Sequence, residues 1–206
     1  MITQNPKKNE KNPKDFLAET IRKSSSISGV NLEKLLAACE VITFDKNTQI
    51  IKEGDIVDYF YFISKGIIRV YYHNDGKEII DWFAEEGCFF GNLFSYIMKK
   101  PGIDIYESIE NVTLLRIKYT MMEQLFKESH EIESAALKIM QEHYVKYVER
   151  VHPLKGLAAE EKYHLFTKNY ASYINRIPLK FVADYLGITS ETLSRIRSSK
   201  KSKKAK

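Results

Sequence analysis

The spacing of apolar residues changes several times along the chain, and each change marks a different kind of element. Residues 1–15 are polar and rich in Lys, Asn and Pro. A short amphipathic helix is predicted from Asp15 to Lys23, and a second helix is predicted to begin at Asn31, whose side chain is typical of an N-cap. The chain therefore opens with two short helices.

Residues 41–117 show the pattern of short strands separated by turns. The aromatic and β-branched run 59–63 ends at Lys65-Gly66, and the run 67–72 ends at Asn74-Asp75-Gly76, a hairpin signal. No convincing helical pattern lies between these runs. The region therefore favours an antiparallel sandwich, barrel or jelly roll over a βαβ fold.

After Tyr119 the apolar period becomes helical, and one long helix is predicted from about Ser129 to Pro153. A helix of roughly 24 residues is long for a globular domain. Its apolar stripe needs a cover, either a second copy of the same helix or its own β domain. The second copy is the simpler candidate. The expected dimer contacts are Ile132, Ala136, Ile139, His143 and Tyr147.

The last part of the chain predicts three helices, at 158–170, 179–186 and 190–197. Gly187 suits the left-handed residue that ends a helix, and Thr189 and Ser190 both suit an N-cap for the next one. One shared core is expected from Phe181, Val182, Ala183, Leu186, Ile188, Leu193 and Ile196. This is the pattern of a helix-turn-helix, with an ordinary helical hairpin as the alternative.

The distribution of charge along the chain indicates what kind of partner these helices could bind. The net charge is +5, and residues 195–206 hold seven Lys and Arg and no acid, which leaves 25 basic and 27 acidic residues elsewhere. Local positive charge favours a polyanionic partner, although a basic tail can also be a solubilising segment. The expected DNA-binding residues are Thr189, Ser190, Glu191, Thr192, Ser194, Arg195, Arg197, Lys200 and Lys201.

Other classes of protein fit the sequence poorly. No apolar run approaches 18 residues, and the polar N-terminus is not a secretory signal. The distant pair Cys39 and Cys88 gives no metal or disulfide pattern and suits a reducing cytoplasm. The histidines show no metal spacing, and the strand region contains only His73. We therefore predict no catalytic residues, no metal and no identifiable cofactor.

The order of β domain, long helix and helix-turn-helix resembles the Crp/Fnr family of bacterial transcription regulators. The strongest match is the stretch LGITSETLSR at 186–195, followed by FISKGIIRVY at 62–71 and EGCFFG at 86–91. The resemblance implies an α+β chain. Its parts are a tail and short helix (1–30), a cyclic-nucleotide-binding-like jelly roll (31–128), a dimerisation helix (129–153) and a helix-turn-helix domain with a basic tail (154–206).

The resemblance also implies a function. It predicts a cytoplasmic homodimer that regulates transcription at an inverted repeat of double-stranded DNA, with RNA polymerase and an unidentified small-molecule effector as further partners. Glu191 and Arg195 occupy the family's base-reading places, whereas Ser190 replaces a frequent Arg and the family's β-hairpin wing is missing. Two alternatives stay open: a small-molecule-sensing jelly-roll protein that does not bind DNA, and a cupin-like enzyme with a helical appendage.

The ligand pocket departs from the family pattern. Cyclic-nucleotide binders have Phe-Gly-Glu where this chain has Phe90-Gly91-Asn92, and the following stretch 100–105 has no Arg for a phosphate. We therefore expect no control by cyclic AMP, with Lys99 or Lys100 as the only substitute cations. The candidate pocket residues are Phe90, Gly91, Asn92, Leu93, Tyr147 and Val148.

Overall fold

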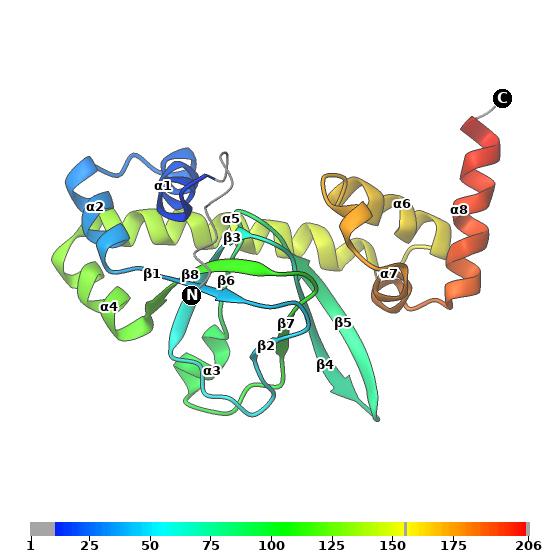
Figure 1. Cartoon of the computed structure of the whole chain (residues 1–206), viewed down its shortest axis with the longest axis horizontal. Helices are drawn as coiled ribbons and strands as arrows, with labels where there is room; N and C mark the ends of the chain where they lie inside the picture. The colour runs from blue at the N-terminus through cyan, green and yellow to red at the C-terminus, as the bar shows by residue number, and fades with distance from the viewer. Residues whose placement is uncertain (1–10, 155, 205–206) are drawn as a thin grey trace, which may run out of the picture.

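The computed structural model describes residues 11–154 and 156–204 and contains two four-stranded antiparallel sheets flanked by helices (Figure 1). The first sheet has the order β1 (Glu40–Phe44), β8 (Val112–Lys118), β3 (Tyr59–Lys65) and β6 (Phe89–Phe90). The second has the order β2 (Gln49–Ile51), β7 (Ile105–Ser108), β4 (Ile68–Asn74) and β5 (Lys77–Ala84). The predicted antiparallel β domain is confirmed.

The turns follow the predicted residues. Asn74 pairs with Lys77 across the β4–β5 hairpin, and both turn residues, Asp75 and Gly76, have positive φ. Between the two sheets, side chains such as Ile63, Ile68 and Leu114 are fully buried and form the interior of the roll. Successive residues of a strand point to opposite faces, so Ile63 faces the interior of the roll whereas the neighbouring Phe62 packs under the helices.

Gly66, in the turn between β3 and β4, has a φ of +98° and lies against a neighbouring strand. A Cβ at this position would lie 2.6 Å from Val112 Cγ1 and 2.8 Å from the Asn111 carbonyl oxygen. Both the backbone conformation and the space therefore require glycine.

We expect Gly66→Ala to lower the free energy of unfolding by about 2–4 kcal/mol, because strain and a steric clash add together. Gly76→Ala is the matched control, since Gly76 also has positive φ but no atom within 4 Å of the added Cβ. Urea denaturation of both variants measures the difference. Equal losses in the two variants would contradict the clash.

One helix in the roll was not predicted. α3 (Leu93–Met98) lies between β6 and β7, where the sequence indicated only strands and turns. It has six residues, too few for a helical period to appear in the sequence. The Asn92 side chain caps it by accepting a hydrogen bond from the Ser95 N–H at 2.9 Å.

Helices cover the outer face of the first sheet. They are α1 (Pro13–Ser24), α2 (Gly29–Ala37), α4 (Tyr119–Glu128) and the long α5 (His130–Leu154). Ser28, and not Asn31 as predicted, is the N-cap position of α2. Asn31 lies inside that helix, and its side-chain amide donates to Glu131 Oε2 at 2.6 Å, which links α2 to α5.

α5 matches the predicted long helix, but its apolar face packs differently from the expectation. Ile132 is 1% exposed and lies in a cluster with α1, α2 and α4 of the same chain, and Ile139 packs against that cluster. Ile132 is therefore not a dimer contact. The helices before and after the sheet supply an apolar surface that the period of α5 alone does not reveal.

The C-terminal helices pack on the outer face of the second sheet. They are α6 (Ala159–Asn169), the short 3₁₀ helix η1 (Ile174–Arg176), α7 (Leu179–Leu186) and α8 (Ser190–Lys204). The ring centroid of Phe83 in β5 lies 5.8–6.1 Å from those of Phe166, Tyr170 and Tyr185. The Arg176 guanidinium pairs with Glu86 and Glu110. Sheet and helices therefore share one core.

Candidate functional site

α7 and α8 are joined by a three-residue turn whose geometry follows from its sequence. Gly187 ends α7 in the left-handed conformation, with φ 66° and ψ 34°. Its N–H donates to the Asp184 carbonyl, and the Ile188 N–H donates to the Ala183 carbonyl. Thr189 opens α8, since its Oγ1 accepts from the Thr192 N–H at 3.2 Å. Of the two predicted N-cap residues, Thr189 and Ser190, it is therefore Thr189 that caps α8.

The predicted core of this unit is confirmed. Val182, Ala183, Leu186 and Leu193 are buried, and three partly buried side chains pack against them. Those three are Phe181, Ile188 and Ile196. Because Ala183 is small and 1% exposed, α8 can approach α7 closely at the turn. The opposite side of α8 is left free of this core.

The exposed side of α8 carries most of the predicted contact residues. Ser190, Glu191, Ser194 and Arg195 are exposed, whereas Arg197 is half-buried. Hydrogen bonds from its own backbone N–H and the Thr189 hydroxyl hold the pKa of Glu191 below its usual range, so this carboxylate is ionised at neutral pH. In Figure 1, α8 lies at the end of the molecule opposite α1 and α2.

Two predicted residues of this set serve the helix itself. The Thr189 and Thr192 hydroxyl oxygens lie 3.1 Å apart within the cap of α8. α8 also continues to Lys204, beyond the predicted end at residue 197, because Ser, Lys and Arg are compatible with a helix and no Gly or Pro interrupts them. The side chains of Lys200 and Lys201 lie outside the described residues.

In cyclic-nucleotide binders, the segment after the Phe-Gly-Glu motif holds a phosphate. Here the segment after Phe90-Gly91 forms hydrogen bonds within the chain. Asn92 is 4% exposed and caps α3. The Gly54 N–H donates to the Gly102 carbonyl at 2.8 Å, and the Gly102 N–H donates to the Asp55 carbonyl at 3.2 Å. Lys99 Nζ lies over the Tyr96 ring, 3.8 Å from its centroid. Asn92 is therefore a structural residue, and its ligand assignment is corrected.

Aromatic rings fill the interior of the roll beside this segment. Phe90 stacks on Tyr61 with centroids 4.9 Å apart and on Tyr106 with centroids 5.3 Å apart. All three rings are less than 8% exposed. This stack fills the interior of the roll beside Asn92 with closely packed apolar rings.

Two cavities flank the roll, and they divide the predicted pocket residues between them. A cavity of about 500 Å³ is lined in part by Phe90, Gly91 and Leu93. A second, of about 670 Å³, lies between β5, β7, α5 and α6 and includes Tyr147. Asn92 and Val148 line neither of them. The six candidate residues do not form one site.

The second cavity holds charged residues that the sequence analysis missed. Asp81, Glu85 and Asp104 line it together with Arg150, whose guanidinium lies 4.9 Å from the centroid of the Trp82 ring. Burial raises the pKa of all three carboxyl groups. The sequence did offer one signal for this cavity. Arg150 lies seven residues after His143, and therefore on the same face of one helix.

The described residues give little support for a metal site, a reactive cysteine or a membrane-spanning helix. Within 11–154 and 156–204, no three His, Cys, Asp or Glu side chains gather as a metal site. Burial raises the pKa of the Cys39 thiol to about 11 and that of Cys88 to about 12, so neither forms a thiolate at neutral pH. In the same part of the chain, each helix is too short or too polar to cross a bilayer.

Comparison with known proteins identifies the β domain. Residues 41–129 match the family model for the cyclic nucleotide-binding domain. Over these residues the chain is similar to that domain. No curated protein sequence matches the chain.

Solved structures show that the cyclic nucleotide-binding domain and the helices after it share their fold with Crp/Fnr-family regulators. The c-di-GMP-responsive global regulator CLP of Xanthomonas campestris is 16% identical, with a TM-score of 0.69 over 85% of this chain and 93% of that one. FixK2 of Bradyrhizobium japonicum is 19% identical, with a TM-score of 0.68 over 80% and 85%. A CooA mutant of Carboxydothermus hydrogenoformans is 15% identical, with a TM-score of 0.63 over 88% and 83%.

Proposed function

We propose that this chain is a sequence-specific DNA-binding transcription regulator that acts as a homodimer on an inverted repeat. The observation that carries the proposal is the exposed side of α8, where Glu191 and Arg195 stand on a helix that follows the Gly187 turn. In this proposal, residues 31–128 form the sensor domain, 129–153 the dimerisation helix and 154–206 the DNA-binding domain.

The chemistry of α8 suits a major groove. A guanidinium such as that of Arg195 can donate two hydrogen bonds to guanine O6 and N7, and the Glu191 carboxylate can accept one from cytosine N4. Ser190 and Ser194 are short and exposed, so they allow a close approach to the DNA. α8 contains one acidic and six basic residues, and this charge favours the phosphate backbone.

A second apolar stripe on α5 supports dimerisation. We call it the α5 stripe: Leu137, Met140, Tyr144 and Tyr147, which are 48–68% exposed. Their spacings of three, four and three residues are those of coiled-coil a and d positions. Tyr147 belongs to both this stripe and the predicted dimer set. The stripe differs from the predicted contacts Ile132, Ala136 and Ile139, which lie toward the helix's own domain.

We expect no tight binding of cyclic AMP. A cyclic phosphate needs a paired cation in a buried site, and the Asn92 side-chain oxygen is already used by the Ser95 N–H in the cap of α3. Isothermal titration calorimetry should show no binding up to millimolar nucleotide. A dissociation constant in the micromolar range or below would contradict this part of the proposal.

Selection from a random double-stranded DNA library, followed by gel-shift titration at fixed salt, tests the whole proposal. The expected result is an inverted repeat whose half-sites lie about one helical turn apart. Equal affinity for selected and scrambled DNA would refute sequence-specific binding. A chain that shifts no DNA at low salt would favour the alternative of a sensing protein that does not bind DNA.

A further inference from the structure

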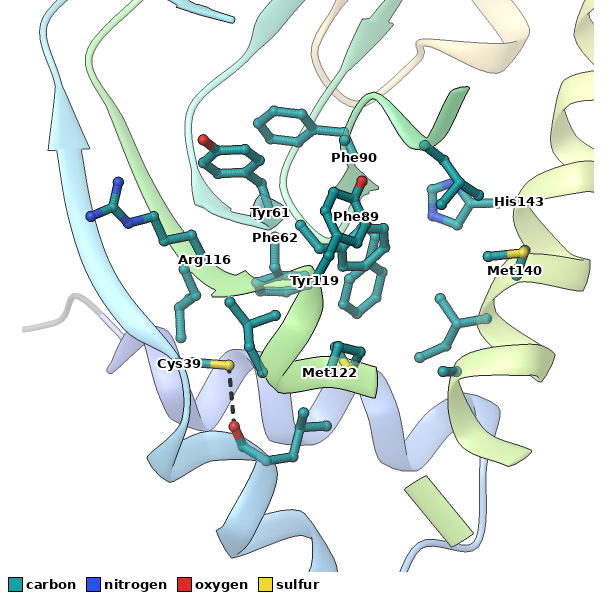
Figure 2. Close-up of a pocket in the computed structure, with 18 of the residues that line it drawn as sticks. Cys39, Tyr61, Phe62, Phe89, Phe90, Arg116, Tyr119, Met122, Met140 and His143 are labelled. Carbon is teal, nitrogen blue, oxygen red and sulfur yellow. Dashed lines mark hydrogen bonds between the residues drawn. The ribbon is translucent and has the colours of Figure 1, made fainter. Parts of the chain in front are cut away.

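The cavity of about 500 Å³ lies between the outer face of the first sheet and helices α1, α4 and α5 (Figure 2). Figure 2 shows Phe62 and Phe89 on one side of this space and Met140 and His143 of α5 on the other. Its lining is almost entirely hydrocarbon, aromatic ring or thioether, as in Ile117, Met122 and Ile139. We call this space the apolar cavity.

The apolar cavity opens at its rim, since exposed Ile97 and Met140 line it beside buried Phe62 and Ile132. Protein interiors are packed as densely as organic crystals, so a recess of about 500 Å³ is large. Water gains little in an apolar cavity, because each molecule needs two to four polar partners. Ligand pockets, in contrast, measure about 300–1,000 Å³ and combine apolar walls with a few placed polar groups. The apolar cavity fits this second description.

One polar group in the wall lacks a partner. The Tyr119 hydroxyl is buried and has no hydrogen-bond partner among the described residues. Its ring is held by stacking on Tyr96, with centroids 4.0 Å apart, and a Cβ at Gly91 would lie 2.5 Å from its oxygen. Burial raises the pKa of Tyr119 well above its usual range, so the hydroxyl stays protonated and can donate.

The charges around the apolar cavity disfavour an ionic ligand. His143 is half-buried in its wall, with its ring edge toward Phe89 at a centroid distance of 6.2 Å, and burial lowers its pKa, so it is neutral at pH 7. Arg116 is paired with Glu40, with Nε 2.9 Å from Oε2. Glu123 accepts a hydrogen bond from the Tyr96 hydroxyl at 2.7 Å. The described lining residues therefore include no unpaired cation that could pair with the carboxylate of a ligand.

We propose that the apolar cavity binds an uncharged, mainly hydrocarbon small molecule whose single acceptor oxygen takes the hydrogen bond of the Tyr119 hydroxyl. The proposal goes beyond DNA binding and does not depend on it. α5 forms one wall, so an occupant contacts the helix that carries the α5 stripe, and Met140 belongs to both the wall and the stripe.

Binding is tested on the full chain with the neutral fluorophore N-phenyl-1-naphthylamine, displaced by 1-decanol or by decanoate. We expect fluorescence to rise on binding and 1-decanol to compete at least about ten-fold better than decanoate, because an unpaired carboxylate is costly in an apolar site. Absence of any fluorescence change, or tighter binding of decanoate, would overturn the proposal.

Three variants locate the site. Ala136→Phe fills the apolar cavity and should abolish fluorophore binding, whereas Lys138→Phe places the same ring on an exposed position of α5 and should leave it unchanged. Tyr119→Phe keeps the packing and removes the donor, so 1-decanol should compete about five-fold less well while the fluorophore binds as before. Normal binding by Ala136→Phe, or unchanged competition with Tyr119→Phe, counts against the site.

Discussion

Replacing Leu137 and Tyr144 by Asp together is expected to convert the protein into a monomer and to weaken specific DNA binding by more than about 100-fold. Both residues lie in the proposed α5 stripe, where they are 55% and 68% exposed within one chain. In a dimer they would be buried, and an unpaired buried charge costs about 3–5 kcal/mol. Analytical ultracentrifugation measures the mass, and gel shift measures the affinity.

Lys138→Asp combined with Val145→Asp is the matched control. Each of these positions is one residue after a stripe residue, and both are exposed, so the pair introduces the same two side chains beside the stripe. The control should remain a dimer. If the control is also monomeric, the dimer contact lies elsewhere on α5. If the wild type is already monomeric at micromolar concentration, the α5 stripe is not a dimer interface.

The second large effect is expected at Arg195. Arg195→Ala should cost about 1–3 kcal/mol per half-site on the selected DNA and relax the preference at one base position, because the guanidinium no longer donates its two hydrogen bonds to guanine. Affinity for scrambled DNA should change little. Gel-shift titrations on selected and scrambled DNA measure both numbers.

Arg22→Ala is the control for charge alone, since Arg22 is exposed on α1 at the opposite end of the molecule (Figure 1). It should leave both affinities unchanged. If Arg195→Ala weakens binding equally on selected and scrambled DNA, then Arg195 contacts a phosphate, and α8 reads its bases through other residues.

Deleting residues 200–206 should have a different signature from Arg195→Ala. The five lysines in this segment suit phosphate contacts, and phosphate contacts carry no sequence information. Binding to all DNA should weaken alike, and the slope of affinity against salt should fall by roughly one unit for every phosphate that a lysine no longer neutralises. A salt titration from about 50 to about 200 mM measures the slope. A weakening confined to the selected DNA would contradict this role.

Local signals in the sequence predicted two of the turns well. Asn74-Asp75-Gly76 forms the expected hairpin turn, and Gly187 has the expected left-handed conformation. These positions are governed by the conformational freedom of one or two residues, so the identity of the residue is sufficient. α3 was missed because its six residues are too few to show a period.

The exposed side of α8 could also be predicted from the sequence. Leu193 and Ile196 turn toward α7, so Glu191, Ser194 and Arg195 must lie on the other side of the helix. The period of a helix settles this geometry without any long-range contact. The end of α8 was less predictable, because no residue between 198 and 204 stops a helix.

The antiparallel β domain, the long α5 and the two helices around Gly187 all follow from the order of residues alone, because periodicity and turn residues act locally. The buried face of α5 does not, since Ile132 is covered by helices about 100 residues earlier in the chain. The role of Asn92 as the cap of α3 likewise emerges only when the chain is folded. Burial depends on what the folded chain brings together, and one segment's pattern does not contain that information.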